Sequence, residues 1–269
     1  MLRDRLLTAA VAIPFLIFLI YCAPVWVFSG AIFLLTCVGL YEFFTLSQSH
    51  SPLPLTIGLG WGGALAAAML LAPDGSSARA ACVGATLVGG LLVTFGFCLY
   101  QRQPERGVFG LALTLFGVVY VGFLFPHLVW VRQVADGKSW VFFIALVAMM
   151  GDSGGYAIGR AWGKHKLIPH ISPGKTVEGS AGAVLGNLGA AAIGWLWLLP
   201  NQAWVECVVL GLILGALAQI GDLCESAVKR AFGAKDSGRL FPGHGGVLDR
   251  VDSLLFPAAF VYYYVTLWP

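Results

Sequence analysis

Long apolar runs separated by short polar breaks fill almost the whole chain. The hydrocarbon core of a bilayer is about 30 Å thick, so a helix needs roughly 20 apolar residues to cross it. With the polar breaks as boundaries, nine runs qualify, approximately at residues 6–23, 26–46, 55–72, 80–100, 107–126, 139–159, 180–199, 204–222 and 252–268. The pattern predicts an all-α, polytopic membrane bundle of about nine transmembrane helices.

The composition supports a membrane protein. Hydrophobic residues make up 58% of the 269 residues and charged residues only 11%, whereas a soluble domain carries about 25% charge. Such a chain cannot cover a globular surface with polar groups. This excludes a water-soluble enzyme, a nucleic-acid-binding domain, a disordered chain and a disulfide scaffold. The 35 glycines suggest a tightly packed bundle, because small residues let membrane helices approach closely.

The N-terminus and the six cysteines carry no processing or metal signal. The cysteines are scattered singly, without a CxxC pair, and are interpreted as buried structural thiols. The first apolar run lacks a small-x-small cleavage site, and Tyr21 before Cys22 argues against lipoprotein processing. We expect a retained first membrane helix.

The positions of Lys and Arg predict the topology. With the N-terminus inside, 13 of the 16 basic residues fall on the inner side, and the outer side keeps only Arg79, Arg132 and Lys138. By the positive-inside rule, the N-terminus is cytoplasmic, the number of spans is odd and the C-terminus is outside. The protein is therefore expected to be a multi-pass protein of the inner (cytoplasmic) membrane.

The acidic residues divide the chain into two regions. The acids of the first half lie mostly at loops or ends of spans: Asp4, Glu42, Asp74, Glu105 and Asp136. All but one of the acids after Met150 fall on or near the inner face, together with nine basic residues. We expect scaffold helices over 1–138 and a catalytic region over 139–269, with cytoplasmic loops 160–179 and 223–251.

Three carboxylates are expected at one depth on the inner side. Asp222 lies about 27 Å along the eighth span, and Asp249 and Asp252 share one helix face where the ninth span begins. Such oxygen ligands suit Mg²⁺, which commonly uses one or two carboxylates plus substrate phosphates. The alternative is that Asp249 and Asp252 favour the helix dipole and pair with Arg250 or Arg230.

Asp152 is a further candidate, because it interrupts an apolar run about 20 Å across the bilayer. An ionisable group at membrane depth is a functional candidate by default. The residues that follow, Ser153, Gly154 and Gly155, suggest a loosened helix that could admit a ligand. The alternative is a buried salt bridge to a neighbouring loop.

Two loops carry phosphate-binding chemistry. Residues 172–176 read SPGKT and end like a phosphate loop, but Pro169 stands where that motif needs glycine. Ser172, Lys175 and Thr176 could still contact phosphate, with Glu178 pairing them or a metal. A plain solvated turn is the alternative.

The second loop follows Asp222. Ser226 and Lys229 share a helix face with Asp222. The cations and glycines that follow could approach an anion such as phosphate. A topology signal or a contact with anionic lipid is the alternative. His244 alone has no metal-ligand spacing around it.

From Ser226 to Asp252 the chain resembles a known signature. These 27 positions read S-x-V-K-R-x4-K-D-S, then P-G-H-G-G-V-L-D-R-V-D from Pro242. The run is similar to the signature of the phosphatidate cytidylyltransferases, also called CDP-diacylglycerol synthases. Residues 151–156 (GDSGGY) and 172–179 (SPGKTVEG) also resemble that family, in which a second Lys often stands at the place of Gly174.

The resemblance implies transfer of CMP from CTP to phosphatidic acid, which forms CDP-diacylglycerol and pyrophosphate in phospholipid biosynthesis. It also implies a homodimer in the lipid bilayer and a Mg²⁺ cofactor, with a second cation left open. The expected catalytic residues are Asp222, Ser226, Lys229, Arg230 and Asp249, and the expected metal ligands are Asp222, Asp249 and Asp252. The expected substrate-binding residues are Asp152, Ser172, Lys175, Thr176, Glu178, Lys235, Asp236, His244, Gly245, Gly246 and Arg250.

The chemistry of the residues agrees with this reaction, because joining two polyanions requires cations that neutralise and position them. Two alternatives remain. A CDP-alcohol phosphotransferase is also acid-rich, but its D-G-x-x-A-R opening is absent, since Leu223 and Cys224 follow Asp222. A secondary transporter is suggested by Asp152 beside glycines at membrane depth, but transporters often show two related halves with sites near the midplane, whereas the ionisable groups here lie in one half of the chain at one face.

Overall fold

The structure is a computed structural model, and it describes residues 14–47, 53, 55–72, 76–238 and 245–268. Residues 14–21 are helical. The first half of the chain then forms α2 (Val25–Ser47), α3 (Leu55–Leu71), α4 (Ser76–Leu99), α5 (Pro104–Gly117), the π-helix η1 (Val118–Phe123) and α6 (His127–Gln133). The second half forms α7 (Gly137–Trp162), β1 (Lys166–Ile168), β2 (Ser172–Thr176), α8 (Val177–Ile193), the π-helix η2 (Gly194–Leu198), α9 (Trp204–Ala231) and α10 (Leu248–Leu267).

The prediction of an all-α, polytopic membrane protein is confirmed. Six helical segments of the described chain are long and apolar enough to cross a membrane: α2, most of α4, the continuous segment Pro104–Gln133, α7, α8 with η2, and α9. The helix α3 is equally apolar but has only 17 residues. The count of nine spans therefore stays a prediction.

The three basic residues assigned to the outer side lie at one end of the bundle. Arg132 Nε and Lys138 Nζ donate to the carbonyl oxygens of Ile20 and Tyr21, at 3.1 and 2.8 Å, and so satisfy acceptors at the end of the first described helix. Arg79 Nη2 donates to the side chain of Gln133, which follows Arg132. This shared position agrees with the predicted topology.

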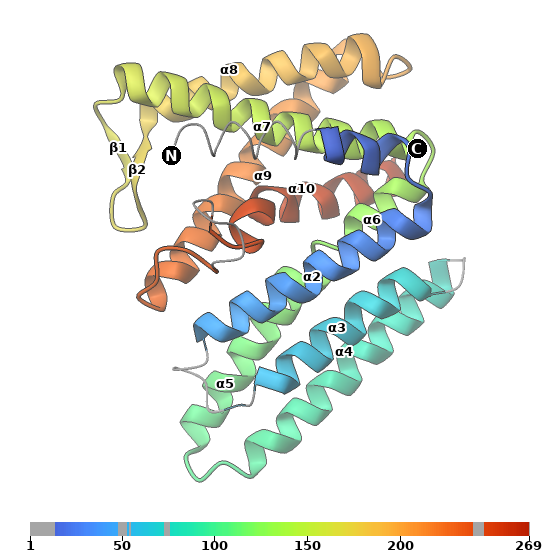
Figure 1. The fold of residues 1–269 in the computed structure, drawn as a ribbon, viewed down its shortest axis with the longest axis vertical. Coiled ribbons are helices and arrows are strands. Elements are labelled where there is room, and N and C mark those ends of the chain that lie inside the picture. Colours follow the sequence, from blue (N-terminus) through green and yellow to red (C-terminus); the bar gives the residue numbers. More distant parts are fainter. Residues whose placement is uncertain (1–13, 48–52, 54, 73–75, 239–244, 269) are drawn as a thin grey trace.

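The helices of both halves of the chain pack around a common core. Figure 1 shows α3 and α4 along one edge of the molecule and α8 along the opposite edge, with α2, α9 and α10 between them. Phe28, Phe43, Phe143, Leu214 and Leu255 are fully buried and come from both halves of the chain. The N-terminal helices therefore share one apolar core with the region that carries the expected site.

Glycines let α7 and α8 pack side by side (Figure 1). A Cβ atom at Gly154 would collide with the carbonyl oxygen of Gly182, and a Cβ at Gly182 with that of Gly154. The helix α7 runs without a break through Gly154 and Gly155. The expected loosening of the helix after Asp152 was therefore wrong: the glycines provide close helix contact, as is common in membrane bundles.

Candidate active site

A cavity of about 530 Å³ lies between α7, α8, α9 and the strand β2. This volume falls in the range of small-molecule binding sites. Its polar lining consists of Asp152, Tyr156, Arg160, Ser172, Lys175, Thr176, Ser180, Asn187, Gln219 and Asp222. Five of the predicted site residues thus lie on one cavity: Asp152, Ser172, Lys175, Thr176 and Asp222.

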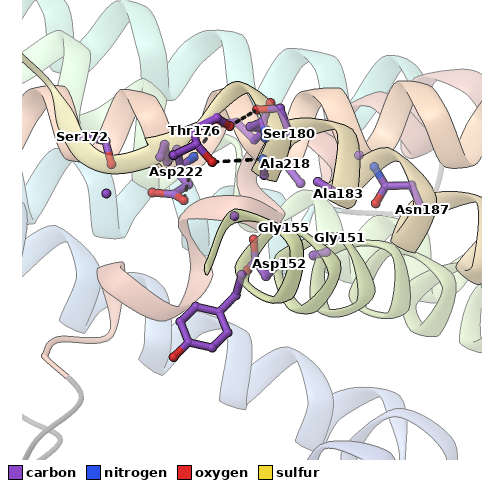
Figure 2. A pocket seen from close by; sticks show the side chains of 18 of the residues that line it. Gly151, Asp152, Gly155, Ser172, Thr176, Ser180, Ala183, Asn187, Ala218 and Asp222 are labelled. Carbon is purple, nitrogen blue, oxygen red and sulfur yellow. Dashed lines mark hydrogen bonds and ion pairs between the residues drawn. The ribbon is translucent and has the colours of Figure 1, made fainter. Parts of the chain in front are cut away.

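Two carboxylates and one ammonium group give the cavity its charge. Asp152 projects from α7, while Asp222 lies on the opposite wall on α9 (Figure 2). Lys175 Nζ is 2.8 Å from Asp222 Oδ2, and both side chains are partly exposed, at 21% and 34%. The hydroxyl of Ser226 also donates to Asp222, at 3.4 Å. The cavity therefore presents both signs of charge, as expected where a metal ion and phosphates meet.

A β-hairpin places Lys175 against α9. Strands β1 and β2 pair in antiparallel fashion, and Lys166 Nζ donates to the carbonyl oxygen of Pro173 at 2.7 Å. The side chain of Thr176 accepts a hydrogen bond from Gly179 N and caps α8. Loop 160–179 is thus an extension of α7 followed by a hairpin rather than a plain turn.

Glu178 helps to hold the hairpin. Its carboxylate accepts hydrogen bonds from the backbone N–H groups of Lys164 and His165 and lies 2.6 Å from His165 Nδ1. Glu178 is not among the residues that line the cavity. Its predicted contact with phosphate or a metal remains a prediction.

A second charged group surrounds Lys229, about two turns along α9 from Asp222. Lys229 Nζ lies 2.6 Å from Asp249 Oδ1 and also pairs with Glu225. The other oxygen of Asp249 accepts hydrogen bonds from Ser237 N, at 2.9 Å, and from Gly246 N, at 2.8 Å. We call these five residues the Lys229 group. It joins the end of α9 to the beginning of α10.

The three predicted metal ligands have different surroundings. Asp222 faces the cavity, Asp249 belongs to the Lys229 group, and Asp252 is only 8% exposed and accepts from Ser253 N. Backbones meet here, since a Cβ at Gly221 would collide with the carbonyl oxygen of Asp252. In the described part of the chain, no three His, Cys, Asp or Glu side chains form a group that could hold a metal ion.

The remaining predicted residues are neighbours of the Lys229 group in the sequence. Arg230 Nε donates to the carbonyl oxygen of Ile171, at 3.3 Å, which ties α9 to the hairpin. Lys235, Asp236 and Arg250 are exposed. Gly245 has a φ of 79°, a conformation that favours glycine. The predicted contact at His244 lies outside the described residues.

Sequence analysis missed several polar residues of the cavity. Tyr156 and Arg160 follow Asp152 at spacings of four and eight along α7, so a helical periodicity applied to Asp152 would have found them. Arg160 Nη1 donates to the Tyr156 hydroxyl at 2.7 Å. Asn187 is 3% exposed, and its Oδ1 atom has no hydrogen-bond partner in the described structure. Its apolar neighbours in the sequence gave no signal for it.

Comparison with known proteins identifies the family. The sequence profile of the cytidylyltransferase family matches residues 3–268. The chain belongs to this family. It is 33% identical to the phosphatidate cytidylyltransferase of Bacillus subtilis (strain 168), over 99% of this chain and 98% of that protein.

Other cytidylyltransferases match over shorter stretches. The phosphatidate cytidylyltransferase of Staphylococcus saprophyticus is 43% identical over 54% of this chain and 55% of its own length. That of Mycobacterium tuberculosis (strain H37Rv) is 36% identical over 62% of this chain and 51% of its own length. Membership of the cytidylyltransferase family favours nucleotidyl transfer over the phosphotransferase and transporter alternatives.

Proposed function

We propose that this cytidylyltransferase transfers CMP from CTP to phosphatidic acid and releases pyrophosphate. The observation that carries the proposal is the cavity in which Lys175 pairs with Asp222 opposite Asp152, in a chain that matches a phosphatidate cytidylyltransferase over nearly its whole length. The product is CDP-diacylglycerol, an intermediate of phospholipid biosynthesis.

The reaction joins two polyanions by an in-line displacement. A phosphate oxygen of the lipid bonds to the α-phosphorus of CTP, while the bond between that phosphorus and the oxygen bridging to the β-phosphate breaks. Pyrophosphate leaves with the electron pair of that bond. The protein must bring two negative reactants together and stabilise charge on the leaving group, which positioned cations do best.

The residues of the cavity support these tasks. Lys175 and Arg160 offer cations to the cavity, and Ser172 and Thr176 offer hydroxyl groups, while the Ser180 hydroxyl donates to the carbonyl oxygen of Thr176. Figure 2 shows Ser172, Thr176 and Ser180 along one side of the cavity. We assign phosphate binding and orientation to this set, with Lys229 and Arg230 on the next turns of α9 as additional cations.

The donor chemistry fits a Mg²⁺ cofactor. Asp222 presents a partly exposed carboxylate to the cavity, and Oδ1 of Asp249 accepts a hydrogen bond from Lys229. We propose that Asp222 and Asp249 hold the ion together with phosphate oxygens of the substrates. The predicted role of Asp252, which is 8% exposed, as a third ligand stays a prediction. When bound, Mg²⁺ neutralises developing charge on the phosphates. A second cation remains an open prediction.

The site is proposed to face the cytoplasm, where CTP is dissolved. The support is the distribution of Lys and Arg and the position of Arg79, Arg132 and Lys138 at one end of the bundle. A site at this interface would let a soluble nucleotide meet a lipid whose acyl chains stay in the bilayer. The homodimer remains a prediction from the family resemblance.

The experiment uses purified protein in vesicles with and without phosphatidic acid. We expect release of pyrophosphate from CTP only when phosphatidic acid and Mg²⁺ are both present, and no release when diacylglycerol replaces phosphatidic acid. Asp222→Asn should nearly abolish turnover while the protein still accumulates in the membrane. Release of pyrophosphate without a lipid phosphate would contradict the proposed acceptor.

A further inference from the structure

A buried glutamate from the N-terminal half reaches the Lys229 group. Glu42 lies in α2 and is only 5% exposed. Its carboxylate accepts hydrogen bonds from Val247 N, at 2.9 Å, and Leu248 N, at 2.8 Å. These two contacts join residues more than 200 positions apart in the sequence.

The contacts cap α10. The N-cap residue of α10 is Val247, whose apolar side chain makes no capping hydrogen bond to the first turn. The first N–H groups of a helix have no partner within the helix, and a buried helix end therefore needs one from elsewhere. Glu42 supplies acceptors for two of them, and a carboxylate at this end also interacts favourably with the helix dipole.

Ser237 connects this cap to Asp249. The Ser237 hydroxyl lies 3.2 Å from Glu42 Oε2 and 2.8 Å from Asp249 Oδ2, and its single proton can be donated to one of them at a time. Asp249 N in turn donates to the Ser237 hydroxyl at 3.3 Å. The position of the Asp249 carboxylate thus depends on where Glu42 holds Ser237 and the first turn of α10.

The packing around Glu42 is close on the side of the signature. A Cβ atom at Gly238 or at Gly246 would collide with the Glu42 side chain. Glycine at these two positions lets the backbone reach the carboxylate. The glycines of the signature therefore serve contact with Glu42 as well as any contact with phosphate.

We propose that Glu42 is a positioning residue of the active site, which fixes the first turn of α10 and, through Ser237, the carboxylate of Asp249. The proposal rests on the proposed function only in that Asp249 is a metal ligand. The N-terminal helices would then contribute to the geometry of the site as well as to the membrane scaffold.

The test is Glu42→Gln. Glutamine has nearly the same shape, but whichever way its amide is turned, an NH₂ group faces an N–H donor of Val247 or Leu248. Hydrogen–deuterium exchange of the full chain in detergent should show exchange at 245–250 that is roughly tenfold to a hundredfold faster than in the wild type. In the same preparation, the Mg²⁺ concentration that gives half-maximal activity should rise, and turnover per folded molecule should fall, each by roughly tenfold or more.

The matched control is Glu206→Gln. Glu206 lies in the first turn of α9 and accepts from the Tyr264 hydroxyl of α10, so it joins α9 to α10 at the other end of these helices. Its replacement should leave exchange at 245–250 and the Mg²⁺ requirement unchanged, whatever it does to the melting temperature. If Glu42→Gln does not fold, Ser237→Ala tests the connection to Asp249, because it removes only the shared hydroxyl and should raise half-saturating Mg²⁺ in the same direction.

Two results would overturn the proposal. The first is unchanged exchange at 245–250 in Glu42→Gln, or an unchanged Mg²⁺ requirement in Ser237→Ala where that variant is the one measured. The second is faster exchange accompanied by wild-type turnover and Mg²⁺ dependence per folded molecule, which would make Glu42 merely structural. If the wild type itself transfers no CMP, the proposed function fails, and the exchange measurement still decides whether Glu42 holds α10.

Discussion

Lys229 is the cation whose removal should have the most complex effect. Its ammonium group lies between the carboxylates of Asp249 and Glu225, and the side chains of Lys229 and Glu225 are 14% and 1% exposed. Lys229→Met keeps most of the apolar stem of the side chain but leaves the carboxylates of Glu225, which is buried, and Asp249, which is partly buried, without this cation. Removing one partner of a buried ion pair costs about 3–5 kcal/mol. Lys229→Met should therefore lower the free energy of unfolding by about this amount.

A second substitution tests the cause of that loss. Glu225→Gln, added to Lys229→Met, removes one of the two uncompensated charges and should recover about 1–3 kcal/mol. The assay is denaturant unfolding in detergent micelles, with Lys138→Met as the control. Lys138 is exposed, and in the described part of the chain it donates to a backbone carbonyl oxygen and to no carboxylate, so its replacement should change stability by no more than about 0.5 kcal/mol.

The reasoning is refuted if Lys229→Met is as stable as Lys138→Met, or if Glu225→Gln destabilises the Lys229→Met protein further. The double variant also separates stability from chemistry. If Lys229 contacts substrate phosphate, transfer stays roughly tenfold to over a hundredfold slower after stability has recovered. Full recovery of transfer in the double variant would show that Lys229 only holds the two acids.

Three further outcomes are expected. Asp152→Asn should accumulate normally in the membrane and lose transfer activity, whereas failure to accumulate would make Asp152 structural; a membrane-fraction immunoblot beside the transfer assay decides. Thr176→Val should cost about 0.5–2 kcal/mol of stability, because the cap to Gly179 is lost, while Thr176→Ser should keep it; equal melting temperatures would be contrary to the cap. Gly182→Ala should cost about 1–3 kcal/mol, since its methyl group meets the backbone of Gly154; an unfolding midpoint no lower than that of the wild type would argue against close packing there.

The apolar spans could be predicted from the sequence because the thickness of the bilayer fixes their length. The predicted run 204–222 nevertheless stops nine residues before the end of α9 at Ala231. The last turns of α9 carry charged residues, so the apolar run in the sequence is shorter than the helix and does not predict where the helix ends. The hairpin over 166–176 was likewise hidden, since hydropathy does not distinguish a short polar strand from a turn.

The site was predictable where its chemistry is local in the sequence. Lys175 and Asp222 were both predicted as site residues, but that they form an ion pair depends on how the hairpin meets α9. Asp249 and Asp252 were expected to share one environment because three residues separate them, yet only Asp249 joins the Lys229 group. Glu42 was assigned to the scaffold, because a carboxylate whose partners are distant backbone N–H groups leaves no pattern in the sequence.

The most direct test of the proposed reaction follows labelled CTP into the lipid. Wild-type protein in vesicles with phosphatidic acid and Mg²⁺ is given CTP labelled with ³²P at either the α- or the γ-phosphate, and the lipid is then extracted. Transfer of CMP predicts that the α-label enters the lipid fraction and that the γ-label stays in water-soluble pyrophosphate. Label from the γ-phosphate in the lipid, or no α-label in it, would contradict cytidylyl transfer to phosphatidic acid.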